Sequence, residues 1–175
     1  MSSPDDVIEA LNYALELERQ GYEFYDRLSR ETKDARGRRM YERLREDEVA
    51  HRQVVEREIA ALRATGEWSE QADSVPASVL AQPSPPIFEV ERALEAGAAG
   101  ARELQALERA IEAERKSRDF YAQQAQRTES PKGRTMWARL SAIEQGHLDL
   151  LTWEHDHIRG EGYWMDIAQF TMDEL

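Results

Sequence analysis

Two copies of the pattern Glu-x-x-His are the residues of this chain best suited to chemistry. They occupy positions 48–51 and 144–147, at an offset of 96 residues. Residues i and i+3 of a helix project to the same side, so each copy offers a carboxylate and an imidazole to the same ions. A further Glu precedes each copy by 30 residues. The candidate ligands of one two-metal site are therefore Glu18, Glu48, His51, Glu114, Glu144 and His147.

The whole chain repeats at this offset. Residues 10–25 align without a gap on residues 106–121, and 20 of the 61 pairs counted from Ala10 to Glu70 are identical. A repeat of this size indicates one supersecondary unit that is used twice. We expect repeat halves at about 4–70 and 100–166.

The residue types indicate both the ligand roles and the metal. Glu48 and Glu144 each share a helix face with a histidine and are expected to bridge the two ions, while Glu18 and Glu114 each bind one ion. Mixed oxygen and nitrogen ligands without thiolate suit iron or manganese. We expect two iron ions, with manganese or a mixed Fe/Mn pair as alternatives.

Composition excludes several classes of protein. The chain has 175 residues, enough for one domain (1–175) with a real core. Its 35 acidic and 23 basic residues give a net charge of −12, which disfavours nucleic acid as a partner. It has no cysteine and so cannot build an iron–sulfur centre. No apolar run approaches the length of a membrane span and the N-terminus does not resemble a signal peptide, so we expect a cytoplasmic protein without a membrane partner.

Apolar residues recur at steps of three and four along four segments, as on the buried face of a helix. This periodicity predicts helices near 4–31, 35–65, 101–128 and 131–161. The fold class is thus all-α, a four-helix bundle of two repeated hairpins. Residues 67–100, rich in Pro, Ser, Ala and Gly, join the hairpins as a long crossover of the ferritin-like kind, with a possible short helix at Phe88 to Glu95.

Several other residues lie on the ligand faces of the helices or directly beside a candidate ligand. Tyr25 and Tyr121 are core positions from which a phenol can hydrogen-bond a ligand carboxylate. Asp47 can orient a histidine through its other ring nitrogen, whereas the repeat-equivalent Ile143 cannot, so the two ions are expected to differ. Two repeat-equivalent glutamates seven residues after the histidines are interpreted as ion-pairing groups at the surface or near the site. They are Glu58 and Glu154.

The pattern A-I-E-A-E-x-x-x-x-x-F-Y, followed 30 residues after its second Glu by E-x-x-H and repeated in each half, resembles the rubrerythrin branch of the ferritin-like superfamily. The resemblance covers about 10–68 and 106–164. It implies a di-iron bundle with the six ligands named above and a role in peroxide detoxification. Members commonly reduce hydrogen peroxide with two electrons from the di-iron site, which a partner then re-reduces.

Two departures from that family pattern affect the expected function. Rubrerythrins proper carry a rubredoxin domain, which a chain without cysteine cannot build, so we expect an external electron-donor protein. They also carry an extra carboxylate one turn after the third-helix ligand, where this chain has Ser117, with Gly21 at the equivalent position of the first half. The remaining six-ligand site is more like that of bacterioferritins. Haem is not expected, because Val49 or Gln145 stands where a haem-binding methionine would be.

Three functions therefore remain open at this point. The first is a peroxidase or ferroxidase enzyme that acts on peroxide or dioxygen. The second is a bacterioferritin-like cage for iron storage, and the third is a di-iron oxygenase or hydroxylase. We expect a homo-oligomer, with a dimer favoured.

Overall fold

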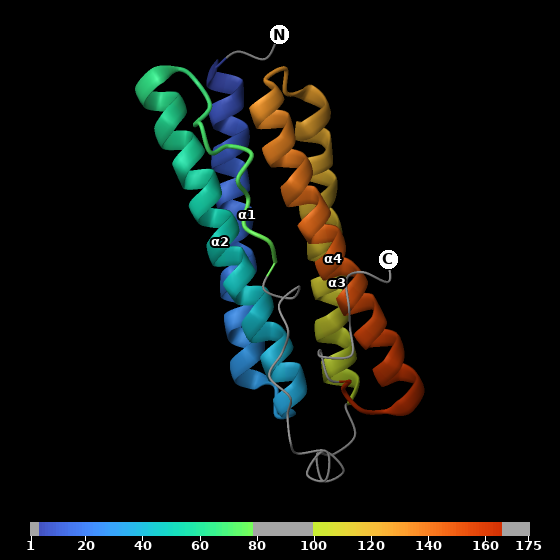
Figure 1. Ribbon diagram of the computed structural model, residues 1–175. Coiled ribbons are helices and arrows are strands. Elements are labelled where there is room, and N and C mark those ends of the chain that lie inside the picture. The colour runs from blue at the N-terminus through green and yellow to red at the C-terminus, as the bar shows by residue number, and fades with distance from the viewer. Residues whose placement is uncertain (1–3, 79–99, 166–175) are drawn as a thin grey trace.

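The computed structural model describes residues 4–78 and 100–165 and consists of four long helices (Figure 1). They are α1 (Pro4–Glu31), α2 (Ala35–Thr65), α3 (Ala101–Arg127) and α4 (Pro131–Glu161). This confirms the all-α four-helix bundle and places the helix bounds within one residue of those predicted. In this part of the chain, no helix is both long and apolar enough to cross a membrane.

Capping residues explain where α2 and α4 begin and end. The Asp34 carboxylate accepts a hydrogen bond from the Arg36 N–H at the start of α2, and Ser130 stands before Pro131 as the N-cap of α4. Gly66 and Gly162 follow α2 and α4 with φ of 75° and 82°. Only glycine adopts this left-handed conformation without strain, so both helices end at these positions.

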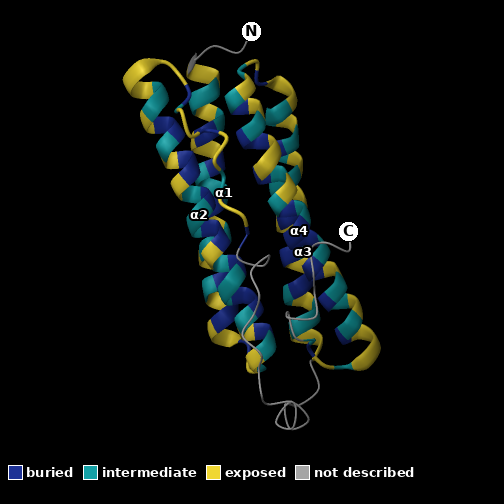
Figure 2. Ribbon diagram, viewed as in Figure 1, coloured by how far each residue is buried: buried dark blue, intermediate teal, exposed yellow. Residues whose placement is uncertain are grey.

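The helices pair as two hairpins, α1 with α2 and α3 with α4, and α1 contacts α3 between the hairpins. In Figure 1, α1 and α4 run in one direction and α2 and α3 in the other. Buried residues concentrate on the inward faces of the helices (Figure 2). They form two apolar clusters, one around Tyr41 and Leu44 and the other around Leu11 and Trp137.

Two repeat-equivalent contacts between tryptophan and glycine join the hairpins to each other. Trp68, which follows α2, packs on Gly133 at the start of α4, and Trp164, which follows α4, packs on Gly37 at the start of α2. A Cβ atom at Gly133 would lie 2.4 Å from the Trp68 ring, and one at Gly37 would lie 2.7 Å from the Trp164 ring. Each tryptophan therefore fills space that only glycine leaves open.

Glu58 and Glu154, expected to form ion pairs at the surface or near the site, are both buried. Glu58 ion-pairs with Arg57 at 2.9 Å and accepts a hydrogen bond from the Ser69 N–H at 2.9 Å. Glu154 accepts one from the Met165 N–H at 2.8 Å. Both carboxylates thus hold the chain that follows their helix, a structural role.

The first part of the crossover runs along the bundle between α2 and α4 (Figure 1). Arg57 of α2 donates to the Gln71 carbonyl at 2.9 Å, and Lys132 of α4 pairs with Glu70 at 2.7 Å. By residue 78 the segment has reached the level of Asp47. The rest of the crossover, including the short helix predicted at 88–95, lies outside the described residues.

Candidate metal centre

All four helices contribute to one buried layer between the two apolar clusters. The six candidate ligands are at most 5% exposed. They are Glu18 on α1, Glu48 and His51 on α2, Glu114 on α3, and Glu144 and His147 on α4. The structure therefore brings together all six side chains that the repeat singled out.

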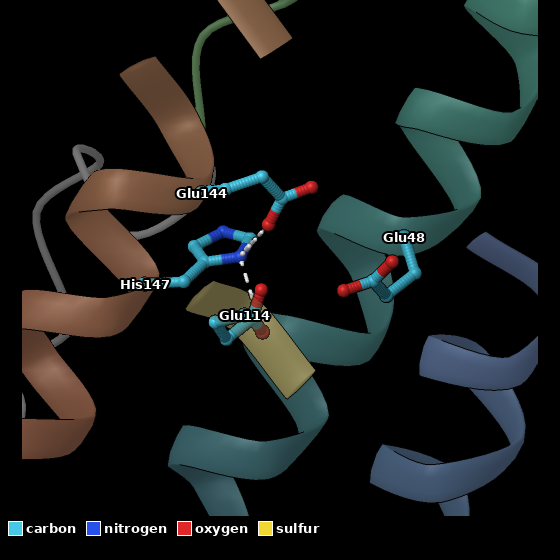
Figure 3. Close-up of side chains that lie close together, drawn as sticks. All are labelled: Glu48, Glu114, Glu144 and His147. Atoms are coloured by element: carbon cyan, nitrogen blue, oxygen red, sulfur yellow. Dashed lines mark ion pairs between the residues drawn. The ribbon is translucent and has the colours of Figure 1, made fainter. Parts of the chain in front are cut away.

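The side chains meet through the Nδ1 atoms of the two histidines. His147 Nδ1 lies 3.1 Å from Glu144 and 3.6 Å from Glu114. Dashed lines mark both contacts in Figure 3. His51 Nδ1 lies 3.3 Å from both Glu18 and Glu144. The two imidazole rings lie nearly parallel, with centroids 5.8 Å apart.

These ligand atoms form two overlapping donor groups. In each group, one atom per residue lies within 4.8 Å of all the others. One group comprises Glu48, Glu114, Glu144 and His147, and the other comprises Glu18, His51 and Glu144. Glu144 belongs to both, as expected of a bridging carboxylate, whereas Glu48 joins only the His147 group.

Several of these buried atoms have no hydrogen-bond partner. They are Glu18 Oε2, Glu144 Oε2, His51 Nδ1 and His147 Nδ1. Buried polar atoms are costly when unpaired, and all four point into the same cluster. Two cations would bind these lone pairs and offset the negative charge, so the residues fit a pair of metal ions.

The electrostatics of the protein chain alone lead to the same conclusion. Burial, together with the charges of Glu18 and Glu144, raises the pKa of Glu48 well above its usual range. Burial and Glu144 raise the pKa of Glu114 to about 8. Burial alone would lower the pKa of His51, but the Glu18 and Glu144 carboxylates raise it to about 10. Without metal the cluster therefore retains protons, and metal binding would release them.

Each carboxylate from the first helix of a hairpin is held by a tyrosine of the opposite hairpin. The Tyr25 hydroxyl donates to Glu114, and the Tyr121 hydroxyl donates to Glu18. All four side chains are buried. The hydrogen bonds predicted for the two tyrosines are present, and they restrict how each carboxylate can turn.

Asp47 contacts only one of the two histidines. Asp47 is on α2, and its carboxylate lies 3.0 Å from Nε2 of His147 on α4. This contact sets the tautomer, because a proton on Nε2 leaves the Nδ1 lone pair available for a metal. Ser78 in turn donates a hydrogen bond to Asp47. Ser78 was not predicted, since it lies in the crossover and carries no helical periodicity.

A cavity of about 560 Å³ opens between α1 and α3 and reaches the site. Glu48, Glu114 and Tyr25 form part of its wall. Gly21 and Ser117 also line it. A Cβ atom at Gly21 would lie 2.7 Å from the Glu48 carboxylate, so the glycine makes room for this ligand.

Comparison with known proteins agrees with this geometry. The rubrerythrin family model matches residues 9–154, so the chain belongs to the rubrerythrin family. Its fold is similar to that of a solved structure described as a hypothetical protein from Pyrococcus furiosus. The TM-score is 0.66 at 18% sequence identity, over 90% of this chain and 92% of that one. No curated protein matches the chain significantly.

Proposed function

We propose that this protein is a di-iron oxidoreductase that reduces peroxide with electrons supplied by an external donor. The observation that carries the proposal is the pair of buried donor groups that share Glu144 and include two histidine Nδ1 atoms without hydrogen-bond partners. Membership of the rubrerythrin family supports redox chemistry at such a site. The six side chains would hold the two ions.

When bound, the iron pair would supply two electrons, which is the number needed to cleave one O–O bond. The protein's own groups prepare the site. Asp47 keeps the proton of His147 on Nε2, and the two tyrosines hold the carboxylates of Glu18 and Glu114. Burial of the ligands excludes bulk water and strengthens every charge interaction within the layer.

Electrons must reach the site from another molecule. The chain contains no cysteine and therefore no iron–sulfur centre of its own. We expect a separate electron-donor protein to supply the electrons during turnover.

The test is stopped-flow mixing of the anaerobic, reduced, iron-loaded protein with hydrogen peroxide and, separately, with dioxygen. We expect peroxide to oxidise the iron faster, with one peroxide consumed for each pair of ions. Zinc-loaded protein, which cannot donate electrons, is the control. If peroxide reacts no faster than dioxygen, the peroxidase assignment is wrong. Size measurement in solution tests the storage alternative, because only a closed multi-subunit shell can store mineral.

A further inference from the structure

The cavity between α1 and α3 is much larger than hydrogen peroxide requires. A water molecule occupies about 30 Å³ of liquid, so a peroxide with two oxygen atoms needs roughly twice that volume. The cavity has about 560 Å³, within the range of about 300–1,000 Å³ that is typical of sites for small organic molecules. Its size alone therefore favours a ligand with more than two heavy atoms.

The lining of the cavity has the character of such a site. Leu17 and Phe24 of α1 and Ala113 of α3 provide apolar surface, whereas Glu48 and Glu114 lie where the cavity meets the metal centre. Exposed charged residues of α3 also line it: Glu108, Arg109, Glu112 and Lys116. An apolar wall beside a polar reactive end suits a molecule with a hydrocarbon body and one polar group.

The residue pair Gly21 and Ser117 keeps this cavity open. Gly21 has no side chain, and an added Cβ atom would meet the Glu48 carboxylate at 2.7 Å. Ser117, its repeat equivalent on α3, is small and lines the same cavity. A long carboxylate side chain at position 117 would take up part of this volume.

We propose that the cavity binds organic hydroperoxides and that these are substrates of the centre. This inference rests on the proposed peroxide reduction and specifies the group on the second oxygen, which is a hydrocarbon instead of a hydrogen. The hydroperoxide accepts two electrons and two protons, its O–O bond breaks, and an alcohol and water are formed. The electrons come from the reduced metal pair, the external donor replaces them, and the protons come from solvent.

The experiment compares cumene hydroperoxide with hydrogen peroxide as oxidants of the iron-loaded protein. It also measures binding of 2-phenylpropan-2-ol, the product alcohol, to zinc-loaded protein by ligand-observed NMR. Ser117→Leu fills the cavity, and Ala113→Phe narrows it from an exposed position that tolerates a large side chain. Gln123→Leu adds the same leucine at an exposed position of α3 that does not line the cavity and is the matched control.

We expect both cavity variants to lower the rate constant for cumene hydroperoxide by about tenfold or more, because the aromatic ring loses its buried contacts. The rate constant for hydrogen peroxide should fall by a smaller factor than that for cumene hydroperoxide, since it needs little of this volume. Both rate constants should stay unchanged in Gln123→Leu. Alcohol binding should weaken in parallel in both variants and remain unchanged in Gln123→Leu.

Two results overturn the inference, and they are distinguishable. If hydrogen peroxide is reduced but the alcohol does not bind and cumene hydroperoxide is inert, the organic substrate is wrong and the peroxidase function stands. If the alcohol binds and the cavity variants block it, yet neither peroxide oxidises the iron, the proposed function itself fails and the hydroperoxide assignment fails with it.

Discussion

Replacement of Asp47 by alanine should weaken one metal position and spare the other. Asp47 and His147 are both almost fully buried, and Nε2 lies 3.0 Å from the carboxylate. Water cannot readily take the place of this contact, and a buried hydrogen bond to a charged group contributes about 1.5–3 kcal/mol. Loss of a group that orients a metal-binding histidine lowers metal affinity by about 10–100-fold. These values agree, since that range corresponds to about 1.4–2.7 kcal/mol.

The assay is an anaerobic Fe(II) titration against a competing chelator, which resolves the two stepwise binding constants. We expect Asp47→Ala to leave one of the two Fe(II) binding constants unchanged and to weaken the other by about 10–100-fold. Ile143→Ala is the matched control, because it truncates the repeat-equivalent residue, which carries no carboxylate. Asp47→Asn should be intermediate, because its amide oxygen still accepts a hydrogen bond. Equal weakening of both constants, or no change in either, would refute a role for Asp47 that is specific to His147.

Three further outcomes follow from the same structure. Glu144→Gln should lower the metal content at both positions, whereas Glu18→Gln should lower it only at the position that contains His51. Metal analysis of the purified variants measures this. Removal of metal should make the stability of the fold depend on pH, because the raised pKa values of Glu114 and His51 mean that the folded protein binds more protons than the unfolded chain. The melting temperature of the metal-free protein should therefore fall as pH rises from about 4.5 through 8 and on to about 10. A flat or rising profile would contradict this. Gly133→Ala should lower the free energy of unfolding by about 1–3 kcal/mol, because its Cβ atom would lie 2.4 Å from the Trp68 ring. Gly160→Ala has nothing within 4 Å of its Cβ atom and should leave that free energy unchanged or raise it by up to about 1 kcal/mol, as measured by chemical denaturation.

Local sequence features were sufficient to predict the helices. Helix ends depend on residues within a few positions of each other, as at Asp34 and Gly66, so their physics can be read directly from the chain. The repeat added what a single motif lacks, namely that two hairpins must present their ligands at one level. That explains why the grouping of the six side chains could be predicted without knowledge of the structure.

Contacts between distant segments could not be predicted in the same way. Asp47 was expected to orient a histidine, but which one depends on how the hairpins pack, and its partner His147 lies 100 residues away. Ser78 lies in a segment without periodicity, and no rule of spacing connects it to Asp47. The contact of Glu58 with the Ser69 N–H was not predicted, because Ser69 follows the helix and helical periodicity says nothing about that segment.

Two departures from the repeat, at Gly21 and Asp47, lie beside the same donor group. The donor group that contains His147 is the one whose imidazole is backed by Asp47. The same group contains Glu48 and Glu114, the two ligands that line the cavity next to Gly21. A carboxylate-backed imidazole is the stronger electron donor to a metal, so under the proposed function an ion held by this group would be the better placed to deliver electrons to a molecule in the cavity. Duplication of one hairpin would by itself produce two equivalent metal positions, and we propose that the differences between residues 21 and 117 and between residues 47 and 143 make them unequal.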